Sequence, residues 1–272
     1  MKLSLSAIST VGASFRDDLR AYSDAGFSGI GIWEMKLGDD DADVDALRAS
    51  GLRATNCVPV VPSILPNAVI EGPTDVEERV EAMCRSVARL ALYEPECVLC
   101  LTGAAGDRSE EEARRLVVEG LRRVAAAAEA AGVRLGLEPI HASQRDALSL
   151  VTSVPEALEL LDEAGLPHVG VMLDLYHVWD TPTVEDDLRR HLGRFTGVHV
   201  ADWHADGRAE RALPGSGVSR TRELIAILAE AGFDGWLDVE IFGTPDDPES
   251  FWALSVDEAA RRAYEAAVGV LP

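Results

Sequence analysis

The sequence has few basic residues, and this shortage limits the partners it can bind. It contains 25 Lys and Arg against 47 Asp and Glu, so the formal net charge is -22. Duplex nucleic acids bind proteins mainly through Lys and Arg side chains that neutralise phosphates. We therefore expect no nucleic-acid partner.

Long apolar runs are also missing. The chain contains no stretch of about 18 apolar residues, the length that a membrane-spanning helix needs. Residues 1–8 run straight into a strand-like pattern and lack the apolar centre of a signal peptide. We expect a cytoplasmic protein without a membrane partner.

Cysteine is scarce, and its placement does not indicate a metal site. The four cysteines include a C-x-x-C pair, Cys97 and Cys100, inside a pattern typical of a buried strand. Residues three apart on a strand point to opposite faces, so these two thiols cannot bind one ion. We expect structural cysteines in a reducing compartment.

Short β-type apolar runs alternate with longer helical patterns along the whole chain, and no low-complexity linker divides them. Such alternation predicts parallel strands with crossover helices, and eight units close a barrel. We predict one (β/α)8 barrel domain over residues 1–272. The strands are expected near residues 2–8, 28–34, 53–60, 97–103, 133–140, 169–176, 195–202 and 235–242. The helices are expected near residues 15–25, 43–50, 75–92, 109–131, 154–164, 184–192, 218–231 and 255–267.

The main rival fold is an open, doubly wound sheet. A glycine-rich nucleotide-binding turn after the first strand would favour it. Residues 8–12, Ile-Ser-Thr-Val-Gly, offer no such turn.

Four consecutive strands in the second half end in potential metal ligands, namely Glu138, Asp174, His199 and Glu240. Strand residues alternate between faces, and in each case aliphatic neighbours occupy the opposite face. All four side chains are therefore expected to point into the barrel at the carboxyl ends of the strands, where barrel active sites lie. Three carboxylates and one imidazole in a dry cavity need a compensating charge. A single divalent cation, Mn²⁺, Mg²⁺, Co²⁺ or Zn²⁺, would supply it.

The motifs around these residues resemble the sugar phosphate isomerase/epimerase family of xylose isomerase-like TIM barrels. The resemblance covers nearly the whole chain and is carried by Leu137-Glu138-Pro139-Ile140-His141, Leu173-Asp174-Leu175-Tyr176-His177-Val178-Trp179, Val198-His199-Val200-Ala201-Asp202-Trp203 and Asp238-Val239-Glu240-Ile241-Phe242. It implies that Glu138, Asp174, His199 and Glu240 bind the metal. It also implies that Glu138 and Glu240 are catalytic and transfer protons, and that His177 contacts the substrate. Relatives often form dimers or tetramers, which implies a possible homo-oligomer.

Further polar residues near the expected strand ends are candidates for substrate binding. His141 and Arg145 follow the fifth strand, and Arg211 lies in the long loop after the seventh. Glu34 and Trp203 are candidates for the pocket wall. Glu34 lies opposite Trp33 on a regular strand, so only one of the two can point inward.

These expectations predict metal-assisted proton transfer next to the carbonyl of a small carbohydrate, a ketose, aldose or keto-cyclitol. The expected activity is that of a sugar isomerase or epimerase. A dehydratase of the inosose type shares the same intermediate, and a non-catalytic sugar-binding barrel is a further alternative. The fold is also similar to the endonuclease IV barrels, but the additional His and Asp ligands of a three-zinc site are absent.

Strand phase also places Arg134 and Asp238 inside the barrel, below the metal ligands. A lone charge there would be costly, so we predict that the two residues form an ion pair.

Overall fold

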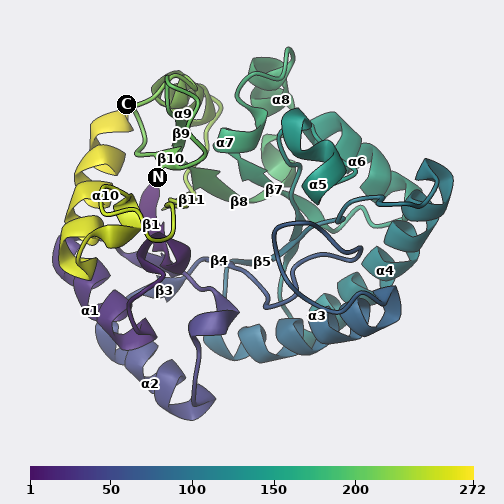
Figure 1. Ribbon diagram of the computed structural model, residues 1–272, viewed down its shortest axis with the longest axis horizontal. Helices are drawn as coiled ribbons and strands as arrows, with labels where there is room; N and C mark the ends of the chain where they lie inside the picture. The colour runs from purple at the N-terminus through teal and green to yellow at the C-terminus, as the bar shows by residue number, and fades with distance from the viewer.

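A ring of short parallel strands forms the centre of the computed structural model, which describes all 272 residues (Figure 1). The strands follow the order β3-β2-β1-β11-β8-β7-β6-β5-β4 around the ring, and every neighbouring pair is parallel. Their bounds are β1 Lys2–Ser6, β2 Gly29–Gly31, β3 Arg53–Ala54, β4 Asn56–Cys57, β5 Cys97–Cys100, β6 Leu135–Leu137, β7 Gly170–Asp174, β8 Phe195–Val200 and β11 Trp236–Val239. A separate antiparallel pair joins β9 Asp202–Trp203 to β10 Arg211–Ala212.

The ring closes because β3 and β4 are two halves of one barrel strand. Only Thr55 separates them: its N–H donates to the Ile30 carbonyl at 2.9 Å, and its carbonyl accepts from the Cys97 N–H at 3.3 Å. Residues 53–57 therefore connect β2 on one side to β5 on the other. Counted this way the barrel has eight strands, which confirms the predicted (β/α)8 fold and excludes the open sheet.

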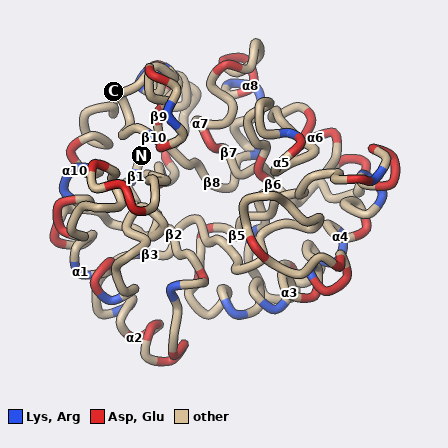
Figure 2. Tube along the Cα trace, viewed as in Figure 1, with Lys and Arg blue, Asp and Glu red and all other residues tan.

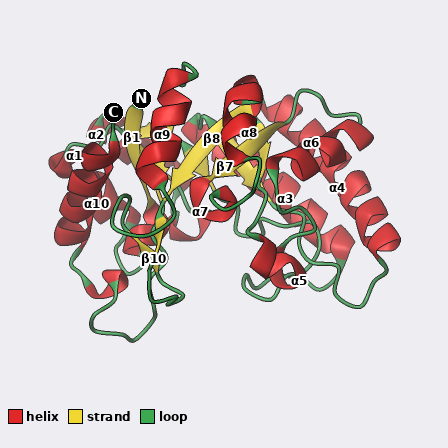
Figure 3. Cartoon of the chain, turned by 90° about the horizontal axis from the view of Figure 1, so that it is seen from above, coloured by secondary structure: helices red, strands yellow, loops and turns green.

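Helices surround the ring and connect successive strands, as Figures 1 and 3 show. The long helices are α1 Phe15–Ala25, α2 Asp40–Ser50, α3 Val76–Leu90, α4 Glu110–Ala131, α6 Val154–Glu163, α8 Val184–Arg190, α9 Thr221–Glu230 and α10 Val256–Val270. The short α5 Arg145–Leu148 and α7 Leu175–Val178 follow β6 and β7. Single 3-10 turns lie at Ala7–Thr10, Glu34–Lys36, Ala91–Tyr93, Ala142–Gln144, Leu192–Arg194 and Phe251–Ala253.

Local sequence signals set the helix ends. At six helix starts a Ser or Asp side chain accepts the backbone N–H three residues on, which satisfies a free donor of the first turn; these caps are Ser14, Asp39, Asp75, Ser109, Ser153 and Ser255. Gly26 ends α1 with a φ of 106°, a left-handed conformation that suits glycine.

The apolar side chains form one continuous core between the helices and the barrel. Charged residues lie mainly along the outer helices, as the red and blue segments of Figure 2 show. All four cysteines are free, and three of them are buried. None of the helices combines the length and apolar character required to cross a bilayer.

Longer loops gather at one end of the barrel, together with α5, α7 and β10 (Figure 3). These elements follow the carboxyl ends of β6, β7 and β8. The same end holds the candidate site.

Candidate functional site

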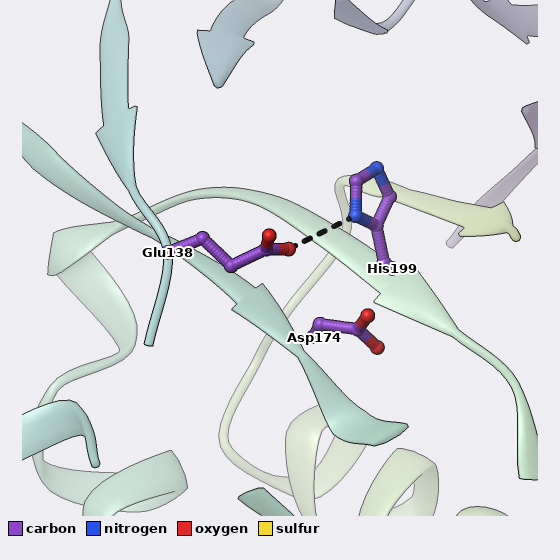
Figure 4. A group of neighbouring side chains, drawn as sticks. All are labelled: Glu138, Asp174 and His199. Carbon is purple, nitrogen blue, oxygen red and sulfur yellow. Dashed lines mark hydrogen bonds and ion pairs between the residues drawn. The ribbon is translucent and has the colours of Figure 1, made fainter. Parts of the chain in front are cut away.

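Buried polar side chains from neighbouring strands meet at this end of the barrel. Glu138 follows β6, Asp174 ends β7, and His199 lies on β8 beside Asp174 in the strand register. One ligand atom from each of these three residues lies within 4.8 Å of the others (Figure 4). Glu240 follows β11 and is equally buried, but it is not part of this group of three.

The imidazole of His199 connects the two glutamates. Its Nδ1 lies 3.3 Å from Glu138 Oε1 and 3.6 Å from Glu240 Oε2. Burial alone would lower the pKa of His199, but the carboxylates of Glu240, Glu138 and Asp238 outweigh burial and raise it to about 10. Without a bound cation, His199 therefore carries a positive charge among these acids.

Arg211 on β10 supplies a second positive charge. Its Nη1 donates to Asp174 Oδ2 at 2.9 Å and to Glu240 Oε2 at 3.0 Å. The guanidinium lies over the Tyr176 ring, 4.3 Å from the ring centre, and 4.8 Å from that of Phe242. Ion pairs and aromatic stacking together fix this side chain in one position.

The protonation states around this centre differ because their surroundings differ. Burial raises the pKa of Glu138 to about 7, although His199 opposes the shift. Burial would also raise the pKa of Asp174, but Arg211 and the two nearby histidines lower it below its usual value. Burial lowers the pKa of His177 to about 3, so this imidazole is neutral near pH 7. Its Nε2 lies 3.2 Å from Arg211 Nη2.

The donor set fits a divalent cation. Ligands about 2.1 Å from one ion lie at most about 4.2 Å apart, so Glu138, Asp174 and His199 need only small movements to share an ion. Carboxylate oxygens with one imidazole nitrogen suit Mn²⁺, Mg²⁺, Co²⁺ and Zn²⁺.

A cavity of about 240 Å³ opens beside this centre. Its polar lining residues are Glu138, Gln144, Tyr176, His177, Arg211 and Glu240. Its other lining residues are apolar: Trp33, Val58, Pro62, Val69, Ile70, Leu99, Leu101, Ile140, Leu148, Ala209 and Phe242. Two of the six residues that the sequence suggested for substrate binding, His177 and Arg211, therefore face the cavity.

The other four candidates for substrate binding, His141, Arg145, Glu34 and Trp203, do not line the cavity. His141 Nε2 lies 3.1 Å from Asp180 Oδ2, and Arg145 forms ion pairs with glutamates on α4 and α6. Arg145 therefore pairs with acidic side chains on the outer helices and does not face the cavity.

Glu34 and Trp203 support loops next to the cavity. Glu34 Oε2 accepts the N–H of Val60 at 2.8 Å. Trp203 stacks on the Tyr176 ring, and its Nε1 donates to the Tyr176 carbonyl at 2.7 Å. Trp33, opposite Glu34 in the strand pattern, is the member of that pair that faces the cavity.

Ser6 is a site residue that the sequence reasoning missed. Its hydroxyl donates to Glu240 Oε1 at 3.3 Å and accepts the Trp33 Nε1–H at 3.0 Å. In β1, Leu3 and Leu5 alternate with Ser4 and Ser6. The same alternation that predicted the inward-facing residues of the later strands could therefore have identified Ser6.

The predicted ion pair between Arg134 and Asp238 is wrong. Arg134 is exposed, because it precedes β6 and its long side chain reaches the carbonyls of Glu96 and Thr196 at 3.1 and 2.8 Å. Asp238 is fully buried, and neither of its carboxylate oxygens has a hydrogen-bond partner within the protein. Its Oδ2 lies 3.7 Å from His199 Nε2, which also has no other partner.

A sequence model of the family described as xylose isomerase-like TIM barrel matches residues 19–265 of the chain. The putative hydroxypyruvate isomerase of Streptomyces coelicolor is 29% identical over 266 residues, which cover 89% of this chain and 91% of that protein. The D-psicose 3-epimerase of Enterocloster bolteae is 26% identical over 164 residues, 58% of this chain and 51% of that protein.

Solved structures show the same architecture. A protein from Sinorhizobium meliloti 1021 superimposes with a TM-score of 0.87 at 25% identity, over 99% of this chain and 98% of that one. The IolI protein with a bound zinc atom superimposes with a TM-score of 0.81 at 20% identity, over 100% of this chain and 98% of that one. At 20% identity, the similarity to the IolI protein shows a shared fold and nothing about function.

Proposed function

Because the chain belongs to the xylose isomerase-like TIM barrel family, we propose that it is a divalent-metal-dependent isomerase or epimerase. Its substrate would be a small α-hydroxy carbonyl compound of the ketose, aldose or keto-cyclitol type. The relatives named for isomerase and epimerase activities support this class of reaction.

The observation that carries the proposal is that two buried glutamates, Glu138 and Glu240, line one cavity. Epimerisation next to a carbonyl uses one group that removes the proton and a second that delivers a proton to the opposite face, and isomerisation can use the same groups. Burial raises the pKa of Glu138 to about 7 in the metal-free protein, and a bound cation would favour its carboxylate form, which can accept a proton. Two acids on one cavity provide both functions.

Glu138, Asp174, His199 and Glu240 would hold the cation. When bound, it would polarise the substrate carbonyl and so acidify the neighbouring C–H.

The remaining steps use the chain's own groups. One glutamate takes the α-proton, and Arg211 and His177 contact the substrate oxygens. Return of the proton to the opposite face of the same carbon gives an epimer, whereas return to the neighbouring carbon gives an isomer. Loss of a β-hydroxyl from the same enediolate would make the protein a dehydratase.

Deuterium exchange tests the proposal directly. The protein is incubated in D₂O with dihydroxyacetone, ketohexoses and inososes, and α-deuteration is followed by NMR. We expect exchange that stops after chelation and returns with Mn²⁺ or Co²⁺. Binding of these compounds without exchange would favour a sugar-binding barrel, and a dehydrated product would favour the lyase.

Metal affinity is expected to rise with pH. The metal-free protein holds a proton on His199 below about pH 10 and on Glu138 below about pH 7. Metal binding must displace these protons, so the affinity should increase up to about ten-fold per pH unit for each proton released. Calorimetric titration with Mn²⁺ in buffers of different ionisation enthalpy counts the protons. An affinity that is constant between pH 6 and 9 would contradict this expectation.

Asp238 is expected to strengthen the metal site through His199. With His199 Nδ1 turned to the glutamates, Nε2 faces Asp238, and a carboxylate there orients a ligating imidazole and raises its basicity. Asp238→Asn should weaken Mn²⁺ binding by about 10- to 100-fold. The matched control is Asp43→Asn, the same change at a buried aspartate of α2 that accepts the Gly38 N–H at 2.7 Å and does not line the cavity. Equal Mn²⁺ affinity in the two variants would refute the role of Asp238.

A further inference from the structure

The cavity wall is polar on one half of the barrel and apolar on the other. Except for Gln144, the polar lining residues lie on α7 and β10 or directly after β6 and β11. The apolar residues come mainly from the end of β2, the loop after β4, β5 and the segment after β6. We call the second set the apolar wall and define it as Trp33, Val58, Pro62, Val69, Ile70, Leu99, Leu101, Ile140 and Leu148.

The backbone of the apolar wall offers few free donors. The N–H groups of Val58, Leu101 and Ile140 donate to backbone carbonyls at 2.7 to 3.1 Å, and Pro62 has no N–H. The N–H groups of Val69 and Ile70 donate to the side chain of Asn67. The carbonyls of Val58, Pro62 and Leu101 already accept backbone N–H groups. A substrate hydroxyl against this surface would therefore lose its water and find few partners, either as donor or as acceptor.

The side chains of the apolar wall add almost nothing polar. Trp33 Nε1 already donates to Ser6. Gln144 lies beside the wall, and its Oε1 is buried without a hydrogen-bond partner. The wall can therefore satisfy about one polar substituent, at Gln144, but not a row of hydroxyls.

The loop that supplies Val58 to Ile70 is held in place before any ligand binds. Arg79, a fully buried residue of α3, donates from Nε to the Ser63 carbonyl at 2.9 Å and from Nη2 to the Ser63 hydroxyl at 2.6 Å. Its Nη1 donates to the Pro73 carbonyl at 2.9 Å. The apolar wall is thus a built surface of the cavity.

From these observations we propose that the physiological substrate is an α-hydroxy ketone whose tail, beyond the carbons that exchange protons, is deoxygenated or otherwise non-polar. This inference rests on the proposed function, because the reacting carbons lie at Glu138 and Glu240. The tail packs on the apolar wall and carries at most one polar substituent, which reaches Gln144.

The test compares two six-carbon ketones with the same reacting end. D-Fructose carries hydroxyls on C4 to C6, whereas 1,3-dihydroxyhexan-2-one lacks them. We expect the second compound to exchange its C3 proton with a kcat/KM about 10- to 100-fold higher, since an apolar pocket disfavours an added hydroxyl by up to about that factor. Rates are expressed per open-chain ketone, because D-fructose is largely cyclic.

Variants of the apolar wall make the comparison independent of ring closure. Val58→Thr and Ile70→Asn add polar groups to the wall and should lower the preference for 1,3-dihydroxyhexan-2-one. The preference is a ratio of two substrates, so the open-chain fraction cancels between wild type and variant. The control is Val268→Thr, which makes the same change as at Val58 at an exposed residue of α10 outside the cavity. It should leave the ratio unchanged.

Dihydroxyacetone separates failure of this inference from failure of the proposed function. No α-proton exchange with any of the three compounds would overturn both. Exchange with dihydroxyacetone, combined with an equal or higher kcat/KM for D-fructose than for 1,3-dihydroxyhexan-2-one, would overturn only the non-polar tail. A preference unaltered by Val58→Thr and Ile70→Asn would likewise show that the apolar wall does not select the tail.

Discussion

Glu138→Gln should lower kcat for α-proton exchange by about 10²- to 10⁴-fold, the usual contribution of a positioned base. The amide keeps the size of the side chain but cannot take a proton. Because its oxygen can still bind a cation, the variant should retain part of the metal affinity. Exchange rates by NMR and metal content by elemental analysis measure the two effects separately.

Glu34→Gln is the matched control for this variant. Glu34 is a buried glutamate near the same end of the barrel, but it accepts the Val60 N–H and does not line the cavity. Its replacement should change kcat far less than Glu138→Gln does. Near-normal turnover in Glu138→Gln would remove Glu138 from the proton-transfer step.

Arg211→Met should destabilise the metal-free protein by about 3–5 kcal/mol, the cost of removing one partner from a buried ion pair. Asp174 and Glu240 would lose the guanidinium that donates to both carboxylates. Added Mn²⁺ should restore more stability to this variant than to wild type, since the cation would supply the missing charge. Urea unfolding with and without Mn²⁺ gives both numbers.

Arg145→Met provides the comparison for Arg211. Arg145 forms two ion pairs, but its side chain is 40% exposed, and such pairs contribute about 0–1 kcal/mol. Its loss should therefore be small and independent of Mn²⁺. Equal destabilisation by the two variants would contradict a central electrostatic role for Arg211.

The sequence predicted the barrel well because its signals are local and repeated. Alternation of strand and helix patterns located all eight barrel strands, and side-chain phase oriented residues within them. Asp174 is the last residue of β7 and His199 lies within β8, so both still follow the strand alternation that predicted their inward direction.

Strand alternation gave a wrong direction for a residue that lies before its strand begins. Arg134 lies one residue before β6, so alternation does not control its direction, and its flexible side chain reaches backbone carbonyls outside the barrel. Asp238 lies within β11 and points inward, but its neighbour is His199 rather than Arg134. A contact between two strands depends on their register, which alternation within one strand does not determine.

The cavity could not be predicted in the same way. Val69 and Ile70 belong to a loop without a repeating pattern, and Arg79 fixes that loop through contacts distant in sequence. Gln144 likewise lies in a short turn, where no strand or helix periodicity predicts the direction of its side chain. Candidates such as His141 and Arg145 were chosen by chemical type, and the structure places them outside the cavity.

The two halves of the cavity wall come from separate segments of the chain. Residues after about 135 supply the ionisable side chains that line the cavity, whereas residues 29–101 supply most of the apolar wall. Under the proposed function, substitutions or loop exchanges within residues 29–101 should change which compound is accepted and leave Glu138 and Glu240 in place. A library confined to that stretch is thus the natural route to new substrates on this scaffold.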